Sequence, residues 1–506
     1  MTTANYDSRE APTSQDLETT LKIFQNAILG DAHEFEITKL DRLGIPLWGA
    51  FVWTQDGGFN DGFGYGVDSL AARVSAWGEV MECYHAAKFL KTSPRKRSSY
   101  NKLRDENAIN PISLCLDAGG NYSHDKEIIW TKAKRHANGQ DVWLPLEAVA
   151  IATNDVSAEI SLDEKLFLPI TNGLGAGSTL EQALTHGVLE LIQRDGDCVT
   201  FRAFDAGCKI ELDDVKNEET RNLLKFLEDS NIEITAKLAN VVCGVPVIYV
   251  VGHDRNLNDA EFPLTLSACG EAAHPDREKC FAKALREFVS SRARKRFMHG
   301  SIDDIKRVAP TTYSNRILSD KNRSYESRSV NSILEWTNLS NQEFFDIFKT
   351  PIFDVKSTVK FSELPTIAPD AGNDAKFLLN LLKTRLEAEN MEILYADFTP
   401  QNADFAAVRA IVPGLEGETV SYNRIGRRNF ERLSKRAENE PNLRGIVGTG
   451  EKPESALKIH LTEQDERLIG GEAWINPIEI ERIVGKLYGL YREPNGHTIA
   501  KIKAQQ

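Results

Sequence analysis

Hydrophobic positions along the chain follow two different periods, and together these predict a body built from both helices and strands. Between about residues 40 and 412, β-rich stretches alternate with segments in which apolar residues recur every three or four positions. The β-rich stretches include residues 245–252, 262–270 and 408–414. Alternation of this kind predicts a mixed α/β fold.

Changes in pattern along the chain predict three consecutive segments. Residues 1–39 are a polar tail followed by a short helix at residues 17–29, and residues 40–420 form the main body. The turn at Pro413 and Gly414 ends the last β-rich stretch of that body. Residues 421–506 are expected to be rich in helix.

One architectural unit is repeated in the main body. Each copy opens with a loop of small residues, continues through Asp, Ser or Pro, which favour helix starts, and then becomes a periodic helix. A glutamate follows a glycine by thirteen positions in the first two copies, and the third has a longer lead-in. The copies are residues 64–84, 175–195 and 270–292, with Glu79, Glu190 and Glu287 as the glutamates.

The polar faces of these helices carry groups that suit a metal and a phosphate. On the first helix Ser75, Glu79 and Glu82 fall on one face, so two carboxylates stand one turn apart. Like charges at this spacing repel, and Mg²⁺ would remove that cost by bridging carboxylates to the phosphates of a nucleotide. A solvated face of an ordinary amphipathic helix gives the same pattern, so no single helix decides between the two interpretations. The polar line of the second helix is Gln182, His186, Glu190, Gln193 and Arg194, and that of the third includes Arg286, Glu287, Ser290 and Arg292.

The composition of the chain disfavours several classes of binding partner. The chain has 506 residues and a formal net charge of -13, which disfavours a general nucleic-acid or membrane-surface binder. Its N-terminus has no apolar signal region, and no apolar run is long enough to span a bilayer. The seven cysteines form no CxxC pair, so neither a zinc site nor a disulfide framework is indicated. We therefore expect a cytoplasmic protein.

The repeated segments resemble the signature motifs of the YcaO family. TNGLGAGSTLEQALTHGVLELIQRD resembles that family's loop and its helix ending in Glu-x-x-Glu-Arg-Asp, SAWGEVMEC its Ser-x-x-x-Glu-x-x-Glu-Arg helix, and ALREFVSSR its Glu-x-x-Gln-x-Arg helix. The Trp-containing segment 128–149 and VRAIVPGLEG (408–417) resemble its hairpin and its terminal strand. Order and spacing agree over about residues 60–420.

The resemblance implies a YcaO-like fold, with repeated β-strand and helix units around a site for ATP and Mg²⁺ in residues 40–420. It implies an enzyme that phosphorylates a backbone amide oxygen of a peptide, giving an azoline, thioamide or amidine in a ribosomally synthesised, modified peptide. No catalytic residue is assigned. Carried over by motif, the nucleotide-binding residues are Ser75, Glu79, Ser178, Gln182, Glu190, Arg194, Glu287 and Arg292, and the metal-binding residues are Glu79, Glu82, Glu190 and Gln193.

Several positions depart from the family pattern. Tyr65 stands at a lysine position and Cys83 at an arginine position, while Gln182 and Gln193 replace glutamates and Ser290 replaces a glutamine. A neutral amide still offers an oxygen to Mg²⁺ but supplies no charge. The alternative is therefore a catalytically degenerate YcaO-like scaffold or accessory protein.

The resemblance also implies partners. The expected substrate is a precursor peptide, presented by a separate leader-peptide-binding protein because no zinc-bearing recognition domain precedes the core. The C-terminal sequence lacks the proline-rich tail of many azoline-forming members, which lowers the weight of azoline synthesis. A homodimer is left open, and neither nucleic acid nor membrane is expected as a partner.

Overall fold

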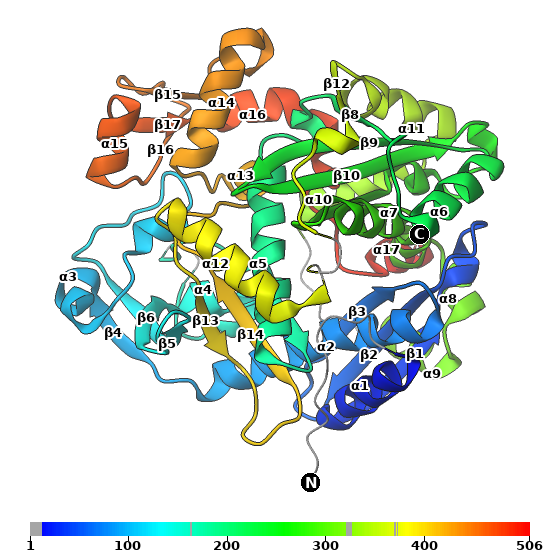
Figure 1. Ribbon diagram of the computed structural model, residues 1–506, viewed down its shortest axis with the longest axis horizontal. Coiled ribbons are helices and arrows are strands. Elements are labelled where there is room, and N and C mark those ends of the chain that lie inside the picture. The colour runs from blue at the N-terminus through cyan, green and yellow to red at the C-terminus, as the bar shows by residue number, and fades with distance from the viewer. Residues whose placement is uncertain (1–12, 162–163, 320–325, 369–370, 372, 506) are drawn as a thin grey trace. The chain divides into compact units, whose positions relative to one another are not determined.

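The computed structural model describes residues 13–161, 164–319, 326–368, 371 and 373–505. The described chain divides into two compact units (Figure 1). Unit 1 comprises residues 81–199 and 373–484, and unit 2 comprises the described residues of 13–80, 200–371 and 485–505. Each unit is thus assembled from stretches far apart in sequence. This division cuts across the three consecutive segments expected from the sequence.

Helices make up much of both units. The α-helices are α1 (Ser14–Ala27), α2 (Ser69–Thr92), α3 (Tyr100–Leu103), α4 (Leu146–Val149), α5 (Leu180–Asp197), α6 (Glu218–Asp229), α7 (Arg277–His299), α8 (Ile302–Val308), α9 (Thr311–Ser319), α10 (Ser327–Trp336), α11 (Asn341–Phe348), α12 (Ala375–Ala388), α13 (Thr419–Tyr422), α14 (Arg427–Asn439), α15 (Glu463–Ile469), α16 (Pro477–Val484) and α17 (Thr498–Gln505).

Unit 1 contains an antiparallel sheet and a small separate one. The larger sheet has the order β4-β5-β13-β14-β7, with β6 paired to β5, and the smaller has the order β15-β17-β16. Helix α5 packs against β7 and β14, and Figure 1 shows it beside β14. The strands are β4 (Lys96–Ser99), β5 (Glu127–Arg135), β6 (Asp141–Pro145), β7 (Leu174–Gly177), β13 (Leu394–Asp397), β14 (Ala406–Ile411), β15 (Val447–Thr449), β16 (Leu457–Lys458) and β17 (Ala473–Ile475).

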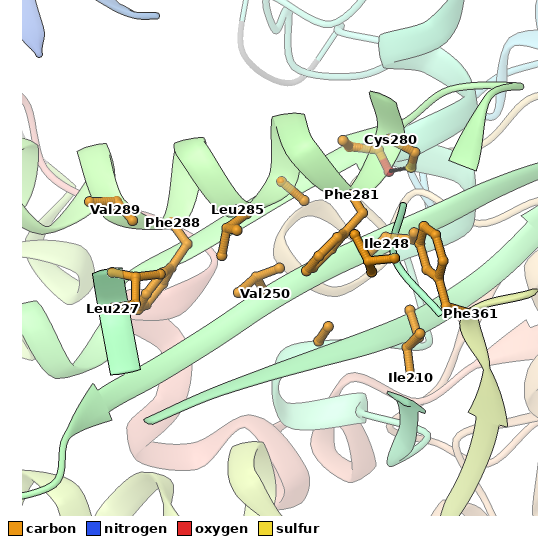
Figure 2. Close-up of a cluster of buried hydrophobic side chains, with 14 of the residues drawn as sticks. Ile210, Leu227, Ile248, Val250, Cys280, Phe281, Leu285, Phe288, Val289 and Phe361 are labelled. Carbon is orange, nitrogen blue, oxygen red and sulfur yellow. Dashed lines mark hydrogen bonds between the residues drawn. The ribbon is translucent and has the colours of Figure 1, made fainter. Parts of the chain in front are cut away.

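Unit 2 contains a three-stranded sheet and a five-stranded sheet. Their orders are β1-β2-β3 and β11-β10-β9-β8-β12. Phe281, Leu285 and Phe288 of α7 pack towards Ile248 and Val250 of β10 (Figure 2). Burying each such side chain stabilises the unit by about 1.5–3 kcal/mol. The strands are β1 (Gly30–Glu36), β2 (Leu47–Thr54), β3 (Phe59–Tyr65), β8 (Cys208–Glu211), β9 (Ile232–Val242), β10 (Val245–Asp254), β11 (Cys269–Ala273) and β12 (Ser357–Lys360).

The repeat expected from the sequence is a strand followed by a helix that packs on it. The three pairs are β3 with α2, β7 with α5, and β11 with α7. In each pair a strand glycine lies against the helix backbone: a Cβ built on Gly64, Gly175 or Gly270 would come within 2.0 Å, 2.0 Å or 1.9 Å of a helix carbonyl oxygen. Only glycine permits this approach, so the loops of small residues serve to bring strand and helix together.

The expected helix starts and the mixed α/β fold are confirmed. Thr179 caps α5 and Asp276 caps α7 through their side chains, while Asp68 accepts the N–H of Ala71 at the start of α2. The Trp-containing segment forms the β5–β6 hairpin, as expected. Among the described helices, none has a stretch that is both long enough and apolar enough to cross a bilayer.

One β-rich expectation is wrong. Residues 262–270 form a 3-10 helix at Pro263–Ser267, and strand β11 begins only at Cys269. Pro263 at the first helical position has no N–H for a sheet. The hydroxyls of Thr265 and Ser267 donate to the carbonyls of Phe262 and Leu264, which favours the turn further.

Candidate nucleotide and magnesium site

The three motif glutamates are held in the same way. Phe63 N–H donates to Glu79 Oε2 at 2.7 Å, Gly173 N–H donates to Glu190 Oε2 at 3.0 Å, and Glu271 N–H donates to Glu287 Oε2 at 3.3 Å. Each donor lies 16 or 17 residues before its glutamate, in or just before the strand of the same unit. A backbone donor fixes the carboxylate and leaves lone pairs for a cation.

In unit 2, Glu79, Glu287 and Tyr65 lie close enough to act on one another through their charges. The Tyr65 hydroxyl donates to Glu287 Oε2 at 3.3 Å. Burial, and after it the charges of Glu287 and Glu79, raise the pKa of Tyr65 above its ordinary value, while Arg294 opposes the shift. Tyr65 therefore stays a neutral hydrogen-bond donor where the family pattern has a cationic lysine.

Glu79 is an exposed residue, but protein atoms close to its carboxyl group displace part of the water around it. Loss of hydration raises its pKa to about 7, and the negative charges of Asp61 and Glu287 add to this effect. The Phe63 N–H and the positive charge of Arg294 oppose the shift. A bound cation would favour the ionised carboxylate further.

In unit 1, Glu82 and Glu190 are bound to β7 and to the loop before it. Ala176 N–H donates to Glu82 Oε1 at 3.1 Å, and His186 Nε2 lies 4.0 Å from the same oxygen. Arg194 lies one turn after Glu190, with 3.5 Å between its guanidinium and the carboxylate. The unit therefore groups two carboxylates with groups that are positive or can become so.

The remaining unit 1 candidates have different surroundings. Ser178 and Gln182 are exposed at the start of α5, where Ser178 N–H donates to Gln182 Oε1 at 3.0 Å. This hydrogen bond ties the loop before α5 to Gln182, which stands at a glutamate position of the family pattern. Gln193 is buried, with an exposed fraction of 7%. Ser75, on α2 in unit 2, is exposed.

The guanidinium of Arg292, a nucleotide-binding candidate by motif, is bound by carboxylates. Arg292 Nε donates to Asp41 at 2.9 Å and NH1 donates to Asp254 at 2.9 Å. The side chain is 1% exposed. Burial alone would lower its pKa, but the two carboxylates raise it above the ordinary value. Arg292 is thus part of a buried ion network, and a direct phosphate contact would have to break that network.

The arginine that acts electrostatically on the unit 2 carboxylates is Arg294. It stands seven residues after Glu287, on the same face of α7, and its charge lowers the pKa of both Glu79 and Tyr65. Matching by motif selected Arg292 instead. Helical spacing from Glu287 is the signal that could have found Arg294.

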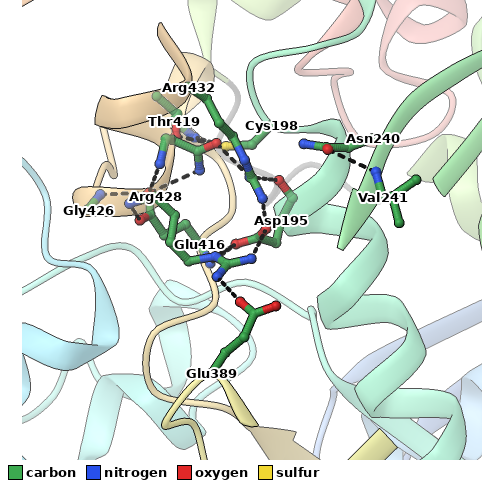
Figure 3. Close-up of polar contacts among 11 residues, drawn as sticks. Asp195, Cys198, Asn240, Val241, Glu389, Glu416, Thr419, Gly426, Arg428 and Arg432 are labelled. Carbon is green, nitrogen blue, oxygen red and sulfur yellow. Dashed lines mark hydrogen bonds and ion pairs between the residues drawn. The ribbon is translucent and has the colours of Figure 1, made fainter. Parts of the chain in front are cut away.

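A buried ion network fixes the end of α5 close to Arg194 (Figure 3). The Asp195 carboxylate is fully buried. It accepts hydrogen bonds from Arg428 Nε at 3.1 Å and from Arg432 Nη2 at 2.5 Å. The N–H of Glu416 donates to the same carboxylate at 3.0 Å. The network joins α5 to α14 within unit 1.

These donor sets fit Mg²⁺ that is shared with a nucleotide. Among the described residues, no group of three or more His, Cys, Asp or Glu is arranged to hold a metal by itself. Mg²⁺ characteristically binds one or two carboxylates, with water and phosphate oxygens completing its shell. Glu79 and Glu190 each accept a backbone N–H at one carboxylate oxygen. Arg294 acts on Glu79 through its charge, and the guanidinium of Arg194 lies 3.5 Å from Glu190.

Comparison with known proteins places this architecture in one class. The family model described as YcaO cyclodehydratase, ATP- and Mg²⁺-binding, matches residues 63–416. The chain therefore belongs to the YcaO family, as its motifs predicted, and the expected cofactors ATP and Mg²⁺ are those of the family. An uncharacterised protein of Methanothermobacter thermautotrophicus is 28% identical over 417 residues, covering 81% of this chain and 96% of that protein.

Solved structures show the same fold. The YcaO of Methanopyrus kandleri, bound with AMPPCP and Mg²⁺, has a TM-score of 0.55 and 20% identity, covering 84% of this chain and 98% of its own. A heterocyclase in complex with substrate and cofactor has a TM-score of 0.57 and 16% identity. The match covers 79% of this chain and spans about half, 52%, of the heterocyclase.

Proposed function

We propose that this protein uses ATP and Mg²⁺ to activate a backbone amide of a precursor peptide by phosphorylation, giving an azoline, thioamide or amidine. The observation that carries the proposal is the threefold strand–helix unit, in which Glu79, Glu190 and Glu287 each accept a backbone N–H. All three units fall within the residues that match the family model.

The residues of this chain would bind and neutralise the triphosphate. ATP supplies the phosphoryl group that turns the amide oxygen into a leaving group. In unit 1, Glu82 and Glu190 are candidate Mg²⁺ ligands, and Arg194 would face phosphate oxygens with its planar fork of donors. In unit 2, Glu79 is a candidate Mg²⁺ ligand. Phosphoryl transfer depends chiefly on such positioning and charge stabilisation. Arg294 is an additional candidate for charge stabilisation in unit 2, and Arg292, Ser178, Gln182 and Gln193 remain candidates by motif.

Titration of the full chain with Mg·ATP tests the proposal. Wild type should bind, and Glu190→Gln should weaken binding by about tenfold or more, because a charged ligand is lost. Glu181→Gln, on the same helix but outside the motif, is the matched control and should bind like wild type. No heat from Mg·ATP with folded wild type would count decisively against ATP-dependent catalysis.

A catalytically degenerate scaffold is the second candidate, and specific contacts favour it. Tyr65 occupies the lysine position and bonds Glu287, Gln182 bonds its own loop, and Gln193 is buried. Phosphate release above background, stimulated by a precursor peptide and abolished in Glu190→Gln, would eliminate this candidate. The peptide and a leader-binding protein are the partners we propose.

A further inference from the structure

A small cavity in unit 1 is only partly used by the proposed nucleotide site. Its volume is about 70 Å³, room for several water molecules or one group of the size of a phosphate. Apolar side chains such as Phe167 and Leu191 form much of the wall. Three arginines also line it: Arg194, Arg409 and Arg424.

Arg409 is a buried cation with unused donor capacity. Its exposed fraction is 6%, and NH1 donates to the carbonyls of Ala150 at 2.8 Å and Ile170 at 2.7 Å. Its Nε has no hydrogen-bond partner, and no carboxylate of the described chain forms an ion pair with it. Burial, reinforced by the positive charge of Arg424, lowers its pKa to about 10. An anion bound in the cavity would offset the free-energy cost of burying this positive charge.

Arg424 is also held by carbonyls. Its Nε and NH2 donate to Cys115 O and Leu114 O, each at 3.0 Å, and the guanidinium lies 4.2 Å from the ring centre of Phe167. It makes no ion pair with the described carboxylates. A guanidinium has five N–H donors, so Arg424 also retains some for a ligand.

The acidic side chain that lines the cavity is directed elsewhere. Glu416 accepts the backbone N–H groups of Gly426, Arg428 and Asn429 and the Asn429 side-chain amide, at 2.7–3.2 Å. Those four donors fix its carboxylate at the start of α14. Glu190 and Asp155 act on Arg409 only through their charges. The cavity lining thus keeps an excess of positive charge.

We propose that this cavity is an oxyanion site that takes inorganic phosphate, with Arg409 and Arg424 as its main donors and the Asn172 amide on the same lining. A tetrahedral dianion matches more than one guanidinium fork, whereas a carboxylate satisfies one. The inference deepens the proposed function and rests on it only for the origin of the ligand, because phosphate is what ATP turnover releases. Arg194 lines this cavity and also stands beside Glu190, which connects the two sites.

Calorimetric titration of the full chain with inorganic phosphate, without ATP or peptide, tests the proposal. Arg424→Gln should weaken binding about tenfold to a hundredfold, the loss expected for charge-assisted hydrogen bonds. Arg409→Lys keeps the charge but loses the fork, and should weaken it about tenfold. Arg444→Gln is the matched control, because Arg444 is exposed and also bonds a backbone carbonyl; it should bind phosphate like wild type.

Three results would overturn the proposal. They are no phosphate binding to folded wild type, equal binding by wild type and both cavity variants, and acetate binding as tightly as phosphate. Thermal unfolding establishes that each variant is folded, and Arg409→Lys decides the matter if Arg424→Gln does not fold. Because no nucleotide is present, failure here leaves the Mg·ATP result untouched.

Discussion

Ionisation of Glu79 falls within the neutral pH range in the folded chain. The pKa of this carboxyl is about 7, above the ordinary 4.5. The folded state therefore holds the proton more tightly than the unfolded state does. The contribution of Glu79 to the free energy of unfolding is fully present below its ordinary pKa. This contribution is lost as the pH rises through about 7.

Glu79→Gln should be more stable than wild type at about pH 8, and the two should match at about pH 4. The glutamine resembles the protonated acid, so it avoids the cost of ionisation. We expect a gain of at most about 1 kcal/mol, because water reaches the side chain and screens its charge. Thermal unfolding of both proteins across this range measures the difference. A gap that does not change with pH would contradict the raised pKa.

Single residues also show which features of the site motif matching could predict and which it could not. The identities of Glu79, Glu190 and Glu287 and their helical setting could be predicted from sequence, because spacing fixes a helix face. The partners of Arg292 could not, because Asp41 lies 251 residues away and Asp254 lies 38 away. Motif spacing therefore could not show that Arg292 belongs to a buried ion network.

Arg292→Met should lower the free energy of unfolding by about 3–5 kcal/mol, because it leaves buried carboxylates without their cation. Arg286→Met is a control on the same helix. Arg286 pairs with Glu219, which is 56% exposed, so its loss should cost about 1 kcal/mol or less. Urea unfolding measures both. Weaker Mg·ATP binding without any loss of stability would instead return Arg292 to the phosphate site.

At the scale of elements, each repeat unit depends on close backbone contact between a strand and its helix. Cap residues and hydrophobic period predicted where these helices begin. The strand expected across residues 262–270 was wrong because a proline and two hydroxyl side chains favoured a 3-10 turn. Apolar composition alone does not distinguish these conformations.

Gly270→Ala should destabilise unit 2 by about 1–3 kcal/mol or more. Its Cβ would lie 1.9 Å from Ala284 O and 2.2 Å from Phe288 N, both backbone atoms that cannot turn aside. Gly78→Ala is the control, since its Cβ would meet only Phe24 Cε2, at 3.9 Å, inside α2. That control should be stabilising by about 0.5–1 kcal/mol. Equal melting temperatures for the two variants would contradict the packing argument.

At the scale of the whole molecule, the C-terminal residues belong to two different units. Residues up to Val484 complete unit 1, whereas residues 485–505 pack into unit 2. There Glu493 binds Lys295 and His299, and the His497 ring contacts the hydroxyl of Tyr313 at 2.8 Å. The sequence pattern did not show this division, since it predicted residues 421–506 as one helix-rich segment.

Ending the chain at Val484 should speed hydrogen exchange in α7 and α9, because their partners Glu493 and His497 are lost. Strands β5, β13 and β14 of unit 1 should keep their protection. Glu493→Gln is a milder second variant, with the effect confined to the end of α7 around Lys295 and His299. Uniform loss of protection across both units would show that the chain does not unfold by units.

The sequence by itself determined the family, its cofactors, the mixed α/β class and the three helices that carry glutamates, because periodicity, caps and motif spacing are local properties of a chain. The tertiary structure decided which arginine side chains pair with carboxylates and which keep N–H donors for a ligand. Arg292 is bound by distant carboxylates, whereas Arg409 and Arg424 line a cavity without one. Burial and ion pairing depend on residues that only folding brings together, so no local pattern could have shown them.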